Sequence, residues 1–221
     1  NEIFYSAFNG YEWSENLSLN RDFIYPHLSP EVCLDIEGYP WVVWSAYDGY
    51  DYEVWFSLWD GFRWSVESRI TDNEGASDIL PFILFLPGNI PLITWSRMDD
   101  ESQIFLKYRE EENWSAEIKI SGEEGFNRNP RIAVFHNNLG IVWENFIGNI
   151  PKVNMRTLYS SDLIQKNIQK KTCSSLPIKS SMPITKTDNI YPKVFWVGQE
   201  KGQNEIFYSA FNGYEWSENL S

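Results

Sequence analysis

The chain has 221 residues, of which 43% are hydrophobic and 17% are aromatic. Its 31 acidic residues outnumber its 18 Lys and Arg, and the net charge of −13 counts against a nucleic-acid partner, because proteins that bind a phosphate backbone concentrate positive charge. No run approaches the ~18 apolar residues of a membrane span, so no membrane partner is expected. The two cysteines, Cys33 and Cys173, are too few for a disulfide scaffold or a zinc site.

The chain begins and ends with the same 18 residues, NEIFYSAFNGYEWSENLS, at positions 1–18 and 204–221. Residues 53–64 and 104–114 share only a pattern with residues 2–13, so the other repeats have diverged strongly. Perfect identity over 18 residues is therefore not expected of an old duplication. We interpret the chain as excised or engineered, with a duplicated closing hairpin. A slice of a longer natural array that was duplicated recently is the alternative.

Two series of tryptophans recur at an interval of about 50 residues, which is typical of propellers and solenoids. Every member of the first series is followed by Ser, and three of the four members of the second have Pro four residues earlier. The first series is Trp13, Trp64, Trp114 and Trp216, and the second is Trp44, Trp95, Trp143 and Trp196. The interval therefore defines a repeating structural unit.

Within the first unit, the sequence predicts four short strands. The runs 32–35, 41–44, 53–59 and 62–66 are rich in β-branched and aromatic residues. Glu37-Gly38, Asp48-Gly49 and Asp60-Gly61 separate them, and Asp-Gly is a strong hairpin signal. No segment shows the 3.6-residue period of an amphipathic helix. Each unit is therefore expected to be a four-stranded antiparallel meander.

These units predict an all-β fold, a β-propeller of four-stranded antiparallel blades, in a single domain spanning residues 1–221. The expected blades are 29–72, 77–122, 126–172 and 177–221, about four blades in all, with residues 1–18 as a duplicated hairpin of third and fourth strands. The third blade is degenerate, because it lacks the Trp-Ser pair and is polar from Asn154 to Lys171.

The stretch from Pro40 to Ser65 resembles the repeats of sialidase-like β-propellers of the BNR, or Asp-box, type. The Asp-box pattern is Ser-x-Asp-x-Gly-x-x-Trp, whereas residues 57–64 read SLWDGFRW and place Asp one position later. We therefore regard these as degenerate Asp-boxes and predict type I′ turns at Asp60-Gly61 and Asn9-Gly10. The resemblance implies a ring that usually has six blades, with an arginine triad, a Tyr–Glu nucleophile pair and an Asp acid. None of these catalytic residues can be transferred, because the eight arginines share no repeated position.

No arrangement of residues predicts catalysis, a metal site or a cofactor. A glycosidase would need paired carboxylates in the central funnel, and the candidates Asp35, Asp78 and Asp188 do not occupy matching positions. The two histidines, His27 and His136, have no partner at metal or triad spacing. We expect a non-catalytic binding or scaffold module, with a glycoside-acting enzyme of the sialidase type as the alternative.

The connections between the second and third strands are the expected ligand-binding face, since propeller ligands usually bind on that side. These connections carry Tyr47, Tyr50, Arg97 and Phe146, and exposed aromatic rings beside short polar side chains suit a glycan. A protein ligand is also compatible with such a face.

The duplicated hairpin predicts self-association. Two copies compete for one place in the ring, and the spare copy exposes strand edges that can pair with another chain. A homo-oligomer is therefore expected, either by domain swapping or by two spare hairpins that form one four-stranded blade.

Overall fold

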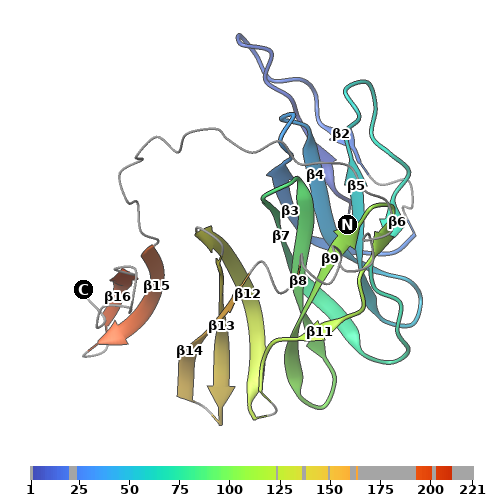
Figure 1. Cartoon of the computed structure of the whole chain (residues 1–221). Coiled ribbons are helices and arrows are strands. Elements are labelled where there is room, and N and C mark those ends of the chain that lie inside the picture. Colours follow the sequence, from blue (N-terminus) through green and yellow to red (C-terminus); the bar gives the residue numbers. More distant parts are fainter. Residues whose placement is uncertain are drawn as a thin grey trace, which may run out of the picture. The chain divides into compact units, whose positions relative to one another are not determined.

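The computed structural model describes residues 2–19, 24–122, 124–135, 138–148, 150–159, 163, 193–200 and 203–210, and nearly all of them lie in strands, turns and the loops between strands (Figure 1). The chain divides into two units, one made of Asn1–Val134 and Asn138–Ser160 and the other of Phe135–Asn137 and Ser161–Ser221. Part of the expected third and fourth blades, with His136, Cys173, Asp188 and Trp216, lies outside the described residues.

Three antiparallel sheets follow one another in the first unit, and they confirm the predicted all-β propeller class. The first sheet has the order β3 (His27–Leu34), β4 (Pro40–Tyr47), β5 (Tyr52–Leu58) and β6 (Ser68–Arg69). The second contains β7 (Ser77–Leu86), β8 (Ile90–Met98) and β9 (Ser102–Glu110), and β9 also pairs with β10 (Asn113–Trp114) and β11 (Ile118–Lys119). The third contains β12 (Phe126–Phe135), β13 (Asn138–Ile147) and β14 (Ile150–Tyr159).

Two further hairpins contain the duplicated sequence. In the first unit β1 (Phe4–Tyr5) pairs with β2 (Leu17–Ser18), and Phe8 forms an isolated bridge with Trp13. In the second unit β15 (Lys193–Glu200) pairs with β16 (Gln203–Ala210).

The first strand of each of the three sheets contains a residue with positive φ immediately before a proline. Ser29, Leu80 and Asn129 have φ of 52°, 53° and 57° and precede Pro30, Pro81 and Pro130. In the first two sheets the register shifts at this point, which marks a β-bulge. A non-glycine residue in this region costs roughly 1–2 kcal/mol, so its recurrence identifies a shared feature of the blade.

The predicted type I′ turns are wrong. In Asp60-Gly61-Phe62-Arg63 only Gly61 has a positive φ, at 98°, whereas type I′ needs two such residues. The Asp60 carboxylate instead accepts the backbone N–H groups of Phe62 and Arg63 at 2.8 and 2.9 Å. The turns that begin at Asn9 and Asp48 have the same pattern, with positive φ at their glycines. The Asn or Asp side chain therefore sets the conformation of these turns.

The Trp-Ser pairs fix the outer corner of the sheets. The Ser65 hydroxyl accepts the Leu58 N–H at 3.2 Å and donates to the Val66 carbonyl at 3.2 Å. The hydroxyls of Ser14 and Ser115 accept and donate in the same way at their own corners. This shared role explains why Ser follows each described tryptophan of the first series.

Replacing Ser65 with Ala should lower the free energy of unfolding by about 1–2 kcal/mol, because the partly buried Leu58 N–H loses its acceptor. Ser68→Ala is the matched control, since the Ser68 hydroxyl makes only an exposed contact with the Val66 carbonyl at 3.3 Å. Urea unfolding of both variants measures the difference. Equal losses would show that the corner hydroxyl has no special role.

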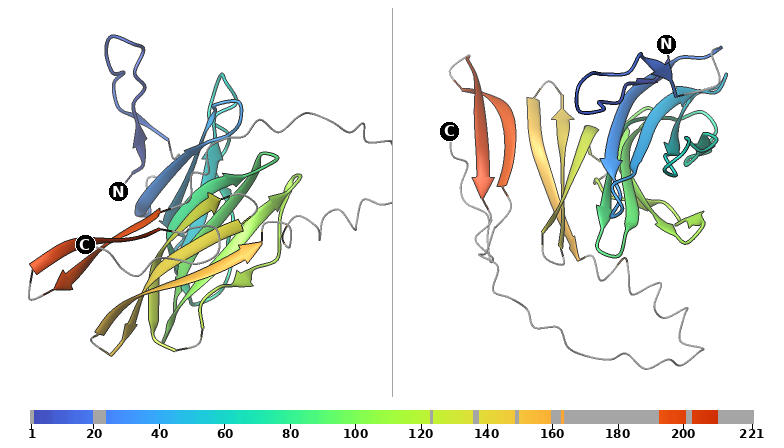
Figure 2. Two further views of the ribbon diagram at one scale, coloured as in Figure 1. Left: turned by 60° about the vertical axis from the view of Figure 1, so that its left-hand side comes forward. Right: turned by 90° about the horizontal axis from the view of Figure 1, so that it is seen from above.

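One core cluster lies between the first two sheets, which face each other in Figure 2, and a second lies between the first sheet and the β1–β2 hairpin. Trp41 stacks on Phe56 and meets Phe85 edge to face, with ring centroids 5.7 and 5.5 Å apart. Trp95 is fully buried in the same cluster. Aromatic rings of this size fill the space between twisted sheets, so much of the high aromatic content has a structural explanation.

Candidate functional site

The first strands of the three sheets each present one buried polar side chain beside a tryptophan of the second series. The Trp44 indole N–H donates to His27 Nδ1 at 2.9 Å, and the Trp143 indole N–H donates to Asn127 Oδ1 at 2.7 Å. Asp78 occupies the corresponding place beside Trp95 in the middle sheet. In the three described sheets, Trp44, Trp95 and Trp143 therefore each lie against the polar side chain of the first strand.

Asp78 and Arg97 form a buried ion pair. Both Asp78 oxygens accept guanidinium N–H groups at 2.8 Å, and the Asn73 side-chain amide donates to the same carboxylate at 2.9 Å. Glu117 binds the other side of Arg97 at 2.7 and 3.0 Å. Burial raises the pKa of Asp78, although Arg97 and Trp95 oppose this effect. The Asp78 side chain has no accessible surface.

Arg97, a predicted ligand-binding residue, is thus engaged inside the protein. Its side chain is only 18% exposed, and the guanidinium lies 4.5 Å from the centroid of the Phe105 ring. Burial lowers the pKa of Arg97, but hydrogen bonds with Asp78 and Glu117 more than offset this and raise it. The donors of Arg97 are directed at carboxylates of its own sheet.

A second buried carboxylate, Glu53, was not among the residues singled out from the sequence. Glu53 accepts the Thr71 hydroxyl and the Asn73 backbone N–H, the latter at 2.7 Å. Burial raises the pKa of Glu53 to about 7, and the charges of Asp78 and Asp51 add to this effect. In the sequence, the signal for this buried carboxylate was a Glu within an otherwise apolar strand. The second sheet has Gln103 at the corresponding position, and its side-chain oxygen accepts the Ser121 hydroxyl.

Tyr47 and Tyr50, both predicted ligand-binding residues, lie on the hairpin that joins β4 to β5. Asp48 orders this turn by accepting the N–H groups of Tyr50 and Asp51 at 2.9 and 3.3 Å, and its other oxygen accepts Arg69 at 2.8 Å. Burial raises the pKa of Asp48, but the two amides and Arg69 lower it by more than this, so the pKa lies below its ordinary value. The Tyr50 side chain is 90% exposed, whereas the Tyr47 ring contacts Tyr25 and Tyr52.

Phe146, the fourth predicted binding residue, lies near the end of β13. The Arg128 guanidinium is 4.7 Å from the centroid of its ring, and Arg128 also pairs with Glu144 at 2.9 Å. The structure brings Tyr47 and Tyr50 together on one turn but places Arg97 and Phe146 on other sheets. Their roles in ligand binding stay predictions.

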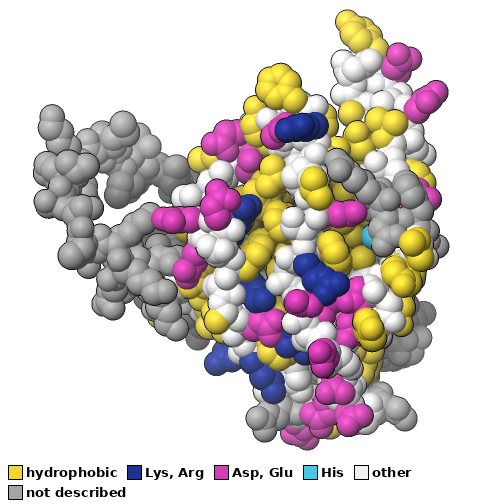
Figure 3. Space-filling model, turned by 90° about the vertical axis from the view of Figure 1, so that its right-hand side faces the viewer, with side chains coloured by type: hydrophobic (Ala, Val, Ile, Leu, Met, Phe, Trp, Pro, Cys, Tyr) yellow, Lys and Arg dark blue, Asp and Glu magenta, His cyan; other side chains and the backbone are white. Residues whose placement is uncertain are grey.

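Acidic side chains surround the β4–β5 turn. Arg69 bridges Asp48 and Asp72, and the Gly75 N–H donates to Asp51 at 2.7 Å, so the link between β6 and β7 lies beside the turn. The β8–β9 connection, at the same end of the second sheet, contains Asp99, Asp100 and Glu101. Figure 3 shows acidic side chains gathered at the lower end of one face. We call the β4–β5 turn, the β6–β7 link and the β8–β9 connection the loop face.

Asp35 and His27, also considered for chemistry, have partners within the first sheet. Asp35 accepts the Tyr39 N–H at 2.8 Å within the β3–β4 turn, and His27 is buried against Trp44. Within the part of the chain that the structure describes, no group of three or more His, Cys, Asp or Glu is arranged to hold a metal ion. The same part contains no helix long and apolar enough to cross a membrane.

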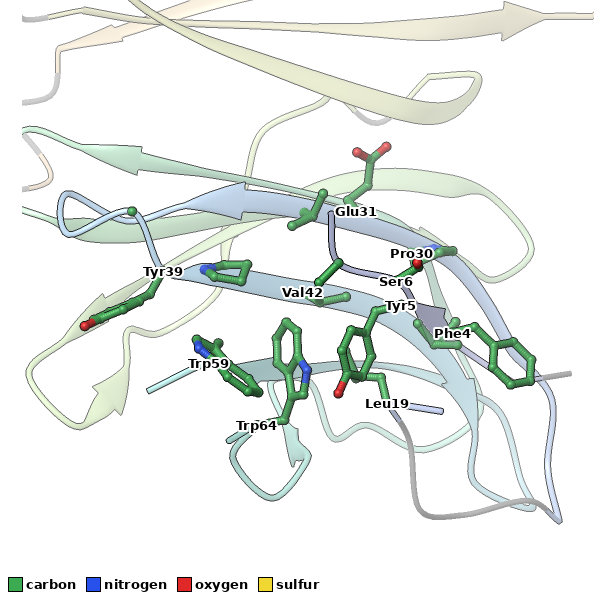
Figure 4. A pocket seen from close by; sticks show the side chains of 15 residues that line it. Phe4, Tyr5, Ser6, Leu19, Pro30, Glu31, Tyr39, Val42, Trp59 and Trp64 are labelled. Carbon is green, nitrogen blue, oxygen red and sulfur yellow. The ribbon is translucent and has the colours of Figure 1, made fainter. Parts of the chain in front are cut away.

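A groove of about 640 Å³ lies between the β1–β2 hairpin and the first sheet (Figure 4). Trp59, Trp64 and Tyr5 form a row along one wall, with edge-to-face contacts at 5.7 and 5.4 Å between ring centroids. Val32, Pro40 and Val42 also line the groove. The groove is mainly apolar and lies outside the loop face.

Comparison with known proteins shows the fold and leaves the activity open. No family model matches the sequence, and no curated protein sequence matches it. The structure is similar to a protein of unknown function from Dyadobacter fermentans, with a TM-score of 0.57 and 13% identity over 72% of this chain and 45% of that one. It is similar to a Hadza microbial sialidase, with a TM-score of 0.55 and 12% identity over 99% of this chain and 52% of that one.

A family 117 glycoside hydrolase from the marine bacterium Zobellia galactanivorans has a TM-score of 0.50 and 11% identity, over 91% of this chain and 72% of that one. The chain thus spans about half the length of the Dyadobacter protein and of the sialidase. At these identities the likeness shows the fold alone. The chain therefore has a fold of the β-propeller type, which it shares with proteins that act on carbohydrates.

Proposed function

We propose that the protein is a non-catalytic propeller module that binds a neutral carbohydrate on its loop face. The observation that carries this proposal is Tyr50, whose side chain is 90% exposed at the tip of a turn that Asp48 and Arg69 hold in one conformation. A rigid aromatic ring loses little conformational entropy when it meets a flat apolar ligand surface.

The surroundings of Tyr50 favour a hydroxyl-rich ligand. Carboxylates are strong hydrogen-bond acceptors, and Asp72, which pairs with Arg69, is largely exposed beside the turn. Sugar hydroxyls donate to such groups while the apolar face of the ring lies on an aromatic side chain. A mixed surface of this kind provides both orientation and contact area.

The charge of the loop face favours a neutral ligand over an anionic one. Asp48, Asp51 and Asp72 lie at the β4–β5 turn and its neighbouring link, and Arg69 is the basic group that pairs with two of them. Like charges brought together at an interface oppose binding. A sialylated or sulfated glycan would therefore be disfavoured at low ionic strength.

Internal pairing of the inner-strand groups supports a role without catalysis. A glycoside hydrolase needs two carboxyl groups that face the substrate. Both Asp78 oxygens are bound to Arg97, and the corresponding residues His27 and Asn127 accept tryptophan N–H groups.

A glycan array followed by titration calorimetry tests the proposal. Tyr50→Ala should weaken binding of a neutral oligosaccharide by about tenfold or more, in line with the loss of a central aromatic contact. Phe62→Ala is the matched control, because Phe62 is 91% exposed on an Asp-Gly turn of the same kind at the opposite end of β5. Equal losses in both variants would contradict the proposed site, as would cleavage of chromogenic glycosides by the wild-type protein.

A further inference from the structure

Three carboxylates hold the β6–β7 link, the segment through which the chain passes from the first sheet to the second. The Asn73 backbone N–H donates to Glu53 at 2.7 Å, and the Asn73 side-chain amide donates to Asp78 at 2.9 Å. The Gly75 N–H donates to Asp51 at 2.7 Å. Asp51 and Glu53 belong to the first sheet and its β4–β5 turn, and Asp78 belongs to the second sheet. The link is therefore anchored to acidic groups on both sides.

The three carboxylates are buried, and their charges are only partly balanced. Asp51 is 5% exposed, and Glu53 and Asp78 have no exposed surface. A buried carboxylate is stable as an anion only where a cation or several hydrogen-bond donors compensate it. Arg97 pairs with Asp78, and in the described part of the chain no Lys or Arg forms an ion pair with Asp51 or Glu53. The Oδ1 atom of Asp51 is buried without a hydrogen-bond partner among the described residues.

The strands beside Glu53 present uncharged groups to it. The Thr71 hydroxyl, just after β6, donates to Glu53. On the other side Ala46 of β4 lies opposite Glu53, and His27 of β3 lies opposite Ala46, one strand further away. The Nδ1 atom of His27 accepts the Trp44 indole N–H. None of these contacts compensates a negative charge on Glu53.

The charged groups around Glu53 oppose its ionisation. Burial raises the pKa of Glu53 to about 7, and the charges of Asp78 and Asp51 add to this effect. Arg69 of β6 is engaged by two other carboxylates of the loop face. The link itself carries two further acids, both exposed, which are Asp72 and Glu74. An additional proton on Glu53 is therefore the simplest way to reduce the negative charge of the cluster.

The second sheet shows that an uncharged side chain fits this place in a blade. The Ile104 N–H donates to the Ser121 hydroxyl at 2.9 Å, as the Val54 N–H donates to the Thr71 hydroxyl at 2.8 Å. The Ser121 hydroxyl in turn donates to Gln103, as the Thr71 hydroxyl donates to Glu53. Gln103 is neutral at every pH, so the link that follows it has no titrating anchor at this position.

We propose that the β6–β7 link is a pH-sensitive latch, closed while Glu53 carries a proton and released from the first sheet when that proton passes to water. An ionised Glu53 is hydrated once the Asn73 N–H moves away, so opening relieves the burial of its charge. In the open link Glu53 has its ordinary pKa of 4.5, and in the closed link its pKa is about 7. The ratio of open to closed forms should therefore rise about tenfold per pH unit between these values and level off above pH 7.

Hydrogen exchange of the full-length protein, followed by mass spectrometry at pH 5 and pH 8, tests the latch. After correction for the intrinsic exchange rate, protection of the peptide that contains Asn73 should fall at least about tenfold between the two pH values. The peptide that contains Ser121 is the internal control, because Gln103 does not titrate, and its protection should change much less. An equal fall in both peptides would show a global loss of stability and would overturn the latch.

Variants identify the group that titrates. Glu53→Gln, which places the residue of the second sheet in the first, should abolish the fall, whereas Glu74→Gln, at an exposed position on the same link, should leave it unchanged. Asp51→Asn should lower the pH at which protection stops falling, because one charge that opposes ionisation of Glu53 is gone. An unchanged fall in Glu53→Gln, or an unchanged pH range in Asp51→Asn, would contradict the proposal. No carbohydrate is present in these measurements, so their outcome is independent of what the loop face binds.

Discussion

Asp78→Ala is expected to lower the free energy of unfolding by about 3–5 kcal/mol, the range for removing one partner of a buried ion pair. The substitution removes both short contacts to Arg97 and leaves a guanidinium that is only 18% exposed, with Glu117 as its remaining carboxylate partner. Chemical denaturation at pH 7 measures the loss. Because Asp78 also anchors Asn73, the link between the first two sheets should become more susceptible to proteolysis.

Two controls separate the buried charge from the loss of a side chain. Arg63→Ala removes an exposed ion pair with Asp60 and should change stability by less than about 0.5 kcal/mol. The double variant Asp78→Ala/Arg97→Met also removes the buried guanidinium that has lost one of its two carboxylate partners, and it should recover part of the stability lost in the single variant. A double variant that is less stable than Asp78→Ala would show that the buried charge is not the cause.

The Glu53→Gln variant is expected to gain stability relative to the wild-type protein as the pH rises from 5 to 8. The pKa of Glu53 is raised from 4.5 to about 7 by burial, so the folded protein keeps this proton over a range in which the unfolded chain releases it. The contribution of Glu53 to the free energy of unfolding is fully present below pH 4.5, and it is lost as the pH rises through about 7. The full difference between the two states is on the order of 3 kcal/mol.

The amide of Gln resembles the protonated carboxyl group and does not titrate, so the comparison isolates Glu53 from all other groups. Urea unfolding of wild type and variant at pH 5 and pH 8 should show the variant gaining stability relative to wild type as the pH rises. Glu112→Gln, at an exposed position, should show no such change. A stability difference between Glu53→Gln and wild type that is the same at both pH values would contradict the buried proton.

The repeat and the blade-like sheets were predictable because they depend on patterns within single units. The Asp-Gly turns and the apolar runs placed three strands of the first sheet in the segments where β3, β4 and β5 lie, whereas the fourth strand, expected at 62–66, is β6 at Ser68–Arg69. The conformation of the turns was not predictable in the same way. The Asp60 carboxylate accepts the N–H groups of Phe62 and Arg63, and an Asp-Gly pair alone does not distinguish this from a type I′ turn.

The buried polar groups were harder to interpret because their partners come from other strands. His27 and Asn127 lie 17 and 16 residues before Trp44 and Trp143, and Asp78 lies 17 before Trp95. This nearly constant spacing was a usable signal for an arrangement that recurs in each of the three sheets. Arg97 appeared available to a ligand because its partners Asp78 and Glu117 are 19 and 20 residues away in the sequence.

The groove and the loop face are chemically different surfaces. The groove is apolar, whereas the loop face is polar and carries an exposed tyrosine on an ordered turn.

The most direct test of the central claim, that the loop face binds a neutral carbohydrate, compares one oligosaccharide with its sialylated form by titration calorimetry at low ionic strength. The neutral form should bind at least about tenfold more tightly, because the acidic side chains around Tyr50 repel an added carboxylate. Mass spectrometry of the recovered ligand should show it intact. Equal or tighter binding of the sialylated form, or a cleaved product, would contradict the account.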